Sequence, residues 1–388
     1  MTLLGWLEDE LRRRGIELTR DDIERITRII EEREWISIHP ELYRRLMEDA
    51  SKTLSTEINR AKEEIEAIKN RFKDTVQMLK VNSDIRFNEL SAIGSDASRC
   101  PMPLLIARSA LVSGIALRHP SDNPPSILEE VLIVLPSEMS GTSFRFYVSA
   151  KCESLIPLSV QHQLLNYKPP GIVVIDGPLS ISQWYREIPR RAKKVVEVID
   201  EFIDAKSNLM KLCYEMDIPL IGVVKRGRSR YFHNYSGLAD ESHYSDQYVF
   251  HQMLNYGFRT SSISITEAII KWRKKAKPKE LLITRLPFEI YGFYIKTSKN
   301  PLTPPIRVEY PSYLKDHEDW IANYVLSTAV QTYDSEFDGL PFVQCLAHRD
   351  AKIAGRIMWE VYKQRLYEIS KTGENLSLIA PSKGYSPK

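Results

Sequence analysis

The sequence predicts an α/β protein built on a mixed sheet, and three observations lead to this class. An apolar, β-branched run at 172–175 stops at Asp176, as the buried strands of such sheets do. Other short apolar runs, bounded by turn residues, share the chain with amphipathic helical segments. The chain has 388 residues, 43% hydrophobic and 27% charged, so it is long enough for a large core and is composed like an ordinary globular protein.

The first eighty residues read as helix. Between Leu42 and Leu79, apolar residues recur at steps of three or four, with Lys, Arg and Glu between them. This spacing predicts one long amphipathic helix that packs against the protein's own body or against a second subunit. We therefore expect residues 1–82 to form a helical extension that acts as a scaffold or a dimer arm.

After Val81 the pattern changes to short strands. Three strands are expected before a helix at 154–167, which places Pro157 in a tolerated first turn. The strands are expected at 91–93, 131–135 and 144–149. Three strands, a helix with the acidic Glu153 at its start, and a strand that ends in Asp176 form the order of a ribonuclease H-like core.

The rest of the chain extends this core. A helix at 195–216 and a strand at 218–224 come first, and the strand ends at Lys225. Further strands are expected at 281–284, 291–296 and 306–311, and closing helices at 316–333 and 342–370. We expect one domain at 83–370 and a polar tail at 371–388, with no internal repeat.

Composition narrows the class of protein further. The net charge of +3 gives little general attraction to phosphate, so any nucleic-acid surface must come from local clusters of Lys and Arg. Cys100, Cys152, Cys213 and Cys345 form no CxxC pair, which argues against a zinc ribbon and favours reduced thiols in a cytoplasm. No apolar run reaches the roughly 18–20 residues of a membrane span. A cytoplasmic protein is expected.

Carboxylates are placed where a metal site would need them. Asp96 and Asp176 each follow an apolar strand, so adjacent strands would present both to one ion, and hard cations such as Mg²⁺ and Mn²⁺ prefer carboxylate oxygens. Glu153 is a candidate third ligand, although acidic residues also favour the first turn of a helix for its dipole. Glu138, in a loop between two expected strands, is the alternative.

Two more residues are candidates for the same chemistry. His348 lies on an expected helix, where a histidine is more often structural, but a neutral imidazole also ligates Mn²⁺ or positions water. Lys225 ends its strand, where an ammonium would hold the scissile phosphate; the alternative is a surface lysine with a packed stem.

Two basic runs are candidates for DNA binding. The first is Lys225 with Arg226, Arg228 and Arg230, and the second, from Lys271 to Lys277, includes Lys274 and Lys275. Such runs contact the phosphate backbone without sequence preference, although most are simply solvated. Tyr231, Tyr235 and Trp272 lie nearby and are suited to stacking bases.

Six motifs in order resemble those of the NurA nucleases. Ser95-Asp96-Ala97-Ser98-Arg99 is similar to the first acidic motif of that family, although Ala97 stands where Gly is usual. Val174 to Leu179 resembles the second, and Ile221 to Lys225 the Gly-x-x-Lys strand. The remaining similarities are Ser245-Asp246, Arg307 to Pro311, and Leu340-Pro341 through Ala347-His348.

The resemblance covers about residues 90 to 365 and implies a Mn²⁺-dependent DNA nuclease of end resection, with Mg²⁺ as the alternative ion. It also implies a homodimer, a HerA-type hexameric ATPase as partner, and a metal site of Asp96, Glu153, Asp176 and His348. A catalytically inactive adaptor subunit on a DNA motor is the other hypothesis. A nucleotide-binding regulator is disfavoured because the chain contains no P-loop motif.

Overall fold

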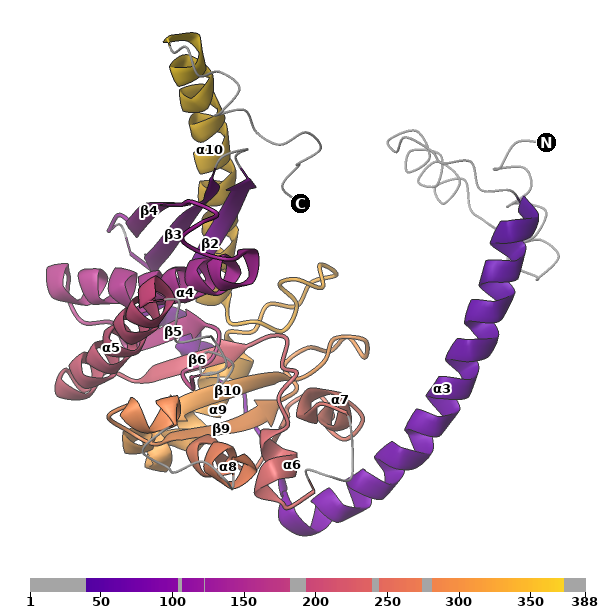
Figure 1. Ribbon diagram of the computed structural model, residues 1–388. Helices are drawn as coiled ribbons and strands as arrows, with labels where there is room; N and C mark the ends of the chain where they lie inside the picture. Colours follow the sequence, from indigo (N-terminus) through magenta and orange to yellow (C-terminus); the bar gives the residue numbers. More distant parts are fainter. Residues whose placement is uncertain are drawn as a thin grey trace, which may run out of the picture. The chain divides into compact units, whose positions relative to one another are not determined.

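Figure 1 shows the computed structural model, which describes residues 40–103, 107–121, 123–181, 193–238, 244–273 and 281–372. The chain divides into two compact units, Met1–Glu64 and Ile65–Lys388. Helix α3 (Pro40–Thr75) begins in the first unit and ends in the second. In the first unit its described side chains are largely exposed; Leu54, for example, is 61% exposed.

The second unit is built on a ten-stranded mixed sheet. Its strands are β1 (Met78–Lys80), β2 (Ala92–Pro103), β3 (Arg108–His119), β4 (Ser126–Val134), β5 (Ile172–Asp176), β6 (Leu220–Val224), β7 (Phe258–Thr260), β8 (Ile263–Ser264), β9 (Ile290–Ile295) and β10 (Ile306–Pro311). The order across the sheet is β1-β7-β9-β10-β6-β5-β2-β3-β4, and β8 pairs with β9.

Half of this sheet is a ribonuclease H-like core. Strands β2, β3 and β4 form an antiparallel meander, and β5 and β6 then add in parallel on the other side of β2. Crossover helices α4 (Gly141–Asn166) and α5 (Lys193–Glu215) make the two parallel connections, as parallel strands require. The carboxyl ends of β2, β5 and β6 therefore point the same way, which prepares one edge of the sheet for a site.

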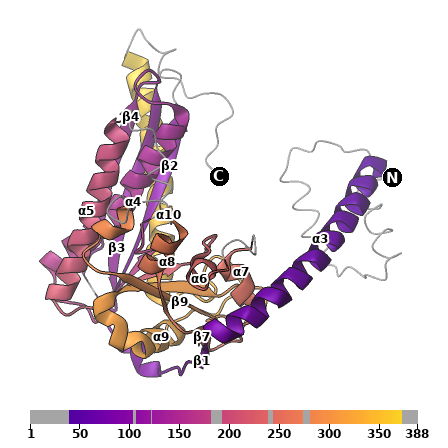
Figure 2. The same ribbon diagram turned by 60° about the horizontal axis from the view of Figure 1, so that its bottom comes forward.

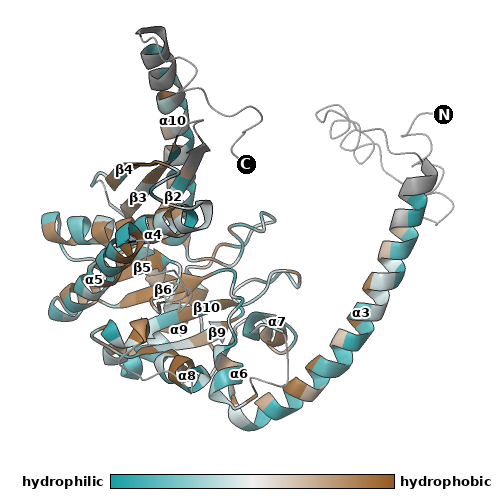
Figure 3. Ribbon diagram, in the orientation of Figure 1, coloured by the Kyte–Doolittle hydropathy of each residue, from teal (hydrophilic) through white to brown (hydrophobic). Residues whose placement is uncertain are grey.

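The two faces of the sheet have separate cores. Along β5, Val173 and Ile175 pack toward α4 and α5, while Ile172 and Val174 pack on the other side with α9 (Glu318–Ser327) and the start of α10 (Phe342–Thr372). Buried on both faces, β5 is a continuous apolar run, which appears brown in Figure 3. In Figure 1 and Figure 2, α4 lies beside β2 and β3, and α5 lies beside α4.

Short helices complete the second unit. They are the α-helices α6 (Tyr231–Tyr235), α7 (Asp246–His251) and α8 (Ile265–Trp272) and the 3₁₀ helices η1 (Ile85–Glu89), η4 (Leu282–Arg285) and η5 (Ser312–His317). The last turns of α3 belong to this unit as well, since Ile68 and Phe72 share a buried cluster with Phe232 and Phe250. The proposed division of the chain at residue 82 stays a prediction.

Among the described residues most of the expected elements are confirmed, and two are wrong. The part of the expected helical extension before residue 40 and the tail after residue 372 lie outside the described residues. Residues 144–149 lie inside α4, because Phe144 and Val148 share one helical face and Ser140 caps the helix by accepting from the Ser143 N–H. Residues 282–285 form η4, where strand was expected.

Three further expectations also need correction. Strand β3 was not foreseen: it is buried between two strands and two helical layers, so it shows no alternation of polar and apolar residues. Pro157 lies inside α4, beyond the first turn where the sequence placed it. For the same reason Glu153 lies in the middle of α4, and not at its start.

Two simpler expectations concern the whole chain. The four cysteines are free, as expected, and three of them are buried. No helix in the described part of the chain is long and apolar enough to cross a bilayer.

Candidate metal centre

The strand register brings Asp96 and Asp176 side by side. Strand β5 ends at Asp176, one residue after Ile175 pairs with Ser95 in the parallel ladder, and Asp96 is the next residue of β2. Strand β2 itself continues to Pro103, so Asp96 does not end its strand as the sequence suggested. The site forms at the point where β5 ends and β2 continues without a parallel partner among the described strands.

Both aspartates face helix α10. Side chains alternate along a strand, and the positions that share a face with Asp96 and Asp176 pack in the core beneath this helix. Gly94 lets α10 approach, because a Cβ there would lie 2.3 Å from the Val343 carbonyl oxygen. The close approach brings His348 of α10 down to the ends of the strands.

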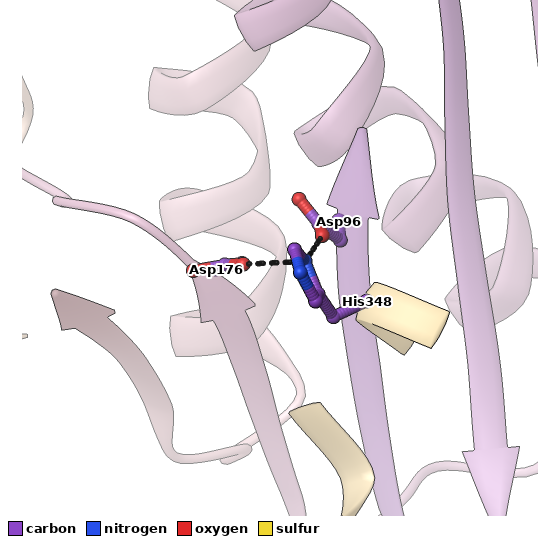
Figure 4. A group of neighbouring side chains, drawn as sticks. All are labelled: Asp96, Asp176 and His348. Atoms are coloured by element: carbon purple, nitrogen blue, oxygen red, sulfur yellow. Dashed lines mark hydrogen bonds and ion pairs between the residues drawn. The ribbon is translucent and has the colours of Figure 1, made fainter. Parts of the chain in front are cut away.

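Figure 4 shows the resulting cluster of Asp96, Asp176 and His348. His348 Nδ1 donates to Asp96 Oδ2 at 2.5 Å and lies 3.6 Å from Asp176 Oδ2. One ligand atom from each of the three residues lies within 4.8 Å of the others, and all three side chains are mostly buried. Two carboxylates and an imidazole at this spacing fit a divalent cation of the Mn²⁺ or Mg²⁺ kind.

Cationic side chains balance the two carboxylates in the structure. Lys225, which follows β6, places its Nζ 2.6 Å from Asp176 Oδ2, and Gln344 Nε2 donates to Asp176 Oδ1 at 2.9 Å. Burial would raise the pKa of Asp176, but the His348 and Lys225 contacts outweigh it and hold the pKa below its usual value. Burial raises the pKa of Asp96, and His348 only partly opposes this effect.

His348 is held from both sides of its ring. Its Nε2 donates to Glu336 Oε1 at 2.9 Å, and Lys352 donates to the other oxygen of Glu336. Hydrogen bonds to Asp176, Asp96 and Glu336 raise the pKa of His348 to about 10, so without a metal it is an imidazolium. The Lys352 and His348 contacts lower the pKa of Glu336 to about 2.

Glu153 approaches the same place from the opposite face of the sheet. Burial raises the pKa of its carboxyl group, Lys206 opposes this effect, and the charges of Asp176 and Asp96 add to it. Glu153 is near the aspartates but outside the three-residue cluster, and its carboxylate accepts no hydrogen bond from the described residues. The alternative carboxylate, Glu138, is exposed and forms an ion pair with Lys194.

The candidate DNA-binding residues fall into two groups. Arg226 and Arg228, directly after Lys225, are exposed and make no ion pair with any described residue, and Arg230 is half-buried. Lys274 and Lys275 lie outside the described residues. Trp272 is exposed, whereas the ring of Tyr231 packs against the Arg307 guanidinium and that of Tyr235 against Lys271.

Sequence reasoning missed Glu336 and Gln344. One face of α10 carries polar residues at every fourth position, namely Gln344, His348 and Lys352. This spacing is visible in the sequence and could have identified Gln344. Glu336 lies in a loop, and no periodicity marked it.

Acidic residues in two of the motifs that resemble NurA have structural roles. Asp246 is fully buried and accepts from the backbone N–H of Phe232 and of His233 at the start of α6. Glu309, also fully buried, pairs with Arg307 and accepts from the Ser180 N–H in the turn after Asp176. This buried pair braces the loop that carries the second aspartate.

Fold and cluster together define a ribonuclease H-like protein with a candidate divalent-metal centre at the ends of its parallel strands. The NurA domain family matches residues 101–353, more than half of the chain, and the chain belongs to this family. No significant match is found among curated proteins.

The chain also resembles solved structures, and the first of them supports the fold. The chain is similar to the NurA nuclease from Sulfolobus solfataricus, with 14% identity, a TM-score of 0.55, and coverage of 85% of this chain and 98% of that one. It is also similar to NurA bound to dAMP and manganese, at 12% identity and a TM-score of 0.46 over 80% of this chain and 94% of that one. Endonuclease V from Bacillus subtilis is a weaker match, at 12% identity and a TM-score of 0.34 over 77% and 92% of the two chains.

Proposed function

We propose that this protein is a metal-dependent DNA nuclease that hydrolyses phosphodiester bonds with Mn²⁺, or alternatively Mg²⁺. The observation that carries the proposal is the meeting of Asp96 of β2, Asp176 at the end of β5 and His348 of α10 in a chain of the NurA family. These three residues would hold the ion, with Glu153 as a further ligand. When bound, such an ion activates water and offsets the charge that builds on the phosphate oxygens.

The protein's own residues have separate roles in this proposal. His348 Nδ1 faces the aspartates and is the atom available to a metal, while Glu336 holds Nε2–H and so selects the tautomer. The Lys225 ammonium, at the edge of the site, would bind the scissile phosphate. Arg226 and Arg228 would hold the flanking backbone.

We infer further that the protein acts as an exonuclease with single-strand endonuclease activity in DNA end resection and double-strand break repair. It would do so as a homodimer docked on a HerA-type hexameric ATPase. Family membership supports this reading, and the chain has no P-loop of its own, so an external motor would have to drive it along duplex DNA. Light scattering coupled to gel filtration tests it: a monomer that never co-elutes with its HerA would contradict it.

Cleavage of end-labelled DNA tests the central activity. We expect degradation with Mn²⁺, none with EDTA, and a loss of several orders of magnitude for Asp176→Asn. The matched control is Asp316→Asn, the same chemical change at an exposed position in η5, which should cleave like wild type. Full activity of Asp176→Asn would refute the assignment and leave the adaptor hypothesis in front.

A further inference from the structure

A pocket of about 760 Å³ lies between β2 and β3 and the first turns of α4. Three arginines, Arg99, Arg108 and Arg145, line it together with Phe144 and Phe146. The other described lining residues are Ser109, Gly141, Thr142, Val148 and Ser149, so none of the lining residues that the structure describes is a carboxylate. A pocket of this size suits one small ligand, and its charge calls for an anion.

Two of the guanidinium groups are hydrogen-bonded in the wall of the pocket, and the third has no such partner among the described residues. Arg99 donates to Ser149 Oγ at 2.5 Å, and Arg108 donates to the Met139 carbonyl. Arg145 is exposed and makes no ion pair with any described residue. Three arginines with no acidic partner among the described lining residues favour a phosphate, which guanidinium groups bind with good geometry.

The stripe of α4 that lines the pocket also carries Glu153, which approaches the metal centre from this side of the sheet. Thr142, Arg145, Ser149 and Glu153 follow one another at steps of three or four, so they lie along a single helical stripe. Arg145 is eight residues from Glu153, or about 12 Å along the helix axis. On β2, Arg99 is three residues from Asp96, an odd spacing that puts Arg99 on the α4 side of the sheet and Asp96 on the α10 side. Beyond Ser95, β2 has no described partner on the β5 side, so a strand bound in the metal centre would pass this edge beside Glu153 and then follow the stripe to the pocket.

We propose that this pocket is a second substrate subsite, which binds one nucleotide of a single DNA strand that extends from the metal centre. The phosphate would lie on the arginines and the unpaired base against the phenylalanine wall, a combination typical of single-strand binding. An unpaired strand is at least as extended as the about 3.4 Å per nucleotide of duplex DNA, so about 12 Å places the subsite at most three to four nucleotides from Glu153. The inference deepens the proposed nuclease function and rests on it.

Binding without metal tests the subsite separately from catalysis. Fluorescence anisotropy in EDTA measures the affinity for labelled single strands of three, six and twelve nucleotides. Wild type should gain affinity between three and six nucleotides, and Arg145→Glu should lose that gain and bind the twelve-mer at least tenfold more weakly. Arg145→Lys keeps the charge and should stay within threefold of wild type.

The matched control is Lys211→Glu. It is the same kind of charge reversal at an exposed position near the carboxyl end of α5, a helix that does not line the pocket. It should bind the twelve-mer within twofold of wild type. The subsite is refuted if Arg145→Glu binds like this control. It is also refuted if a blunt duplex loses as much affinity as the single strand, because a paired base does not reach the aromatic wall.

The two proposals fail in different ways. If wild type cleaves DNA with Mn²⁺ and Arg145→Glu binds and cleaves normally, the subsite is wrong and the nuclease assignment stands. If wild type never cleaves while Arg145→Glu loses single-strand affinity, the nuclease assignment is wrong and the pocket is a strand-binding site.

Discussion

His348 has a carboxylate opposite each ring nitrogen, and this arrangement sets the behaviour of the metal centre. Asp96 faces Nδ1, and Glu336, itself paired with Lys352, faces Nε2. Without metal, the imidazolium and the Lys225 ammonium supply the positive charge that the aspartates require. A divalent cation would replace the charge on His348, and Glu336 would keep the ring in place.

The first prediction separates a ligand from the residue that orients it. Glu336→Gln should lower Mn²⁺-dependent cleavage by about 10–100-fold, as loss of an outer partner of a metal-bound histidine typically does. His348→Ala should lower it further, because a ligand is removed. Initial rates on end-labelled DNA measure both changes. Equal rates for Glu336→Gln and wild type would exclude the orienting role.

The second prediction concerns pH. Because the folded-state pKa of His348 is raised to about 10 from a usual value near 6.5, the imidazolium stabilises the metal-free protein fully below pH 6.5. That contribution is lost as the pH rises through about 10. A metal must displace this proton, so Mn²⁺ affinity should rise with pH between 6.5 and 8.5, by up to about tenfold per unit.

Titration calorimetry at several pH values measures this dependence. His348→Gln, which carries no such proton, should flatten it. A wild-type Mn²⁺ affinity that does not change between pH 7 and 8.5 would contradict the proposed ligand atom.

At the scale of elements, α3 divides into an exposed part and a buried end. Phe72 is fully buried and its ring lies 5.2 Å from that of Phe250 and 5.0 Å from that of His233. These contacts join the last turns of α3 to the body of the second unit. Earlier in the helix, Leu54 is 61% exposed.

The third prediction follows from this division. Phe72→Ala should cost about 3–5 kcal/mol of unfolding free energy, since it leaves a cavity in a closed aromatic cluster. Leu54→Ala on the same helix should change stability by less than about 0.5 kcal/mol. Urea unfolding followed by circular dichroism compares them, and similar losses for both would contradict the packing of Phe72.

How well the sequence predicts a helix or strand depends on how many faces of that element are buried. Strand β5 was recognisable because a fully buried strand is a continuous apolar run that stops at a turn. Residues 144–149 misled because Phe144, Phe146 and Val148 alternate like a strand, although Ser140 caps a helix there. The sequence placed Asp96 and Asp176 after apolar strands. The register that sets them side by side joins strands distant in sequence, and no local pattern contains it.

The whole molecule carries too little net charge to attract DNA, so the attraction has to come from local groups of basic residues. The chain carries a net charge of only +3. The exposed Arg226 and Arg228 lie directly after Lys225 at the site, so phosphate contacts there should dominate the dependence of affinity on salt.

The fourth prediction tests this local attraction. Replacing Arg226 and Arg228 together by Ala should reduce the slope of log affinity against log salt by about 1.5, since each phosphate contact contributes about 0.7–0.9. The loss should be nearly the same for all sequences. Lys211→Ala serves as the control and should leave the slope unchanged. An unaltered slope in the double variant would remove these arginines from the DNA-binding surface.

The fifth and most direct test locates the ion itself. Crystals grown with Mn²⁺ should give a strong anomalous difference peak between Asp96, Asp176 and His348 Nδ1, at about 2.2 Å from each ligand atom. Crystals of Asp96→Ala should lose that peak. If protein that cleaves DNA in Mn²⁺ shows no peak at this position, the metal centre lies elsewhere and the account of its chemistry is wrong.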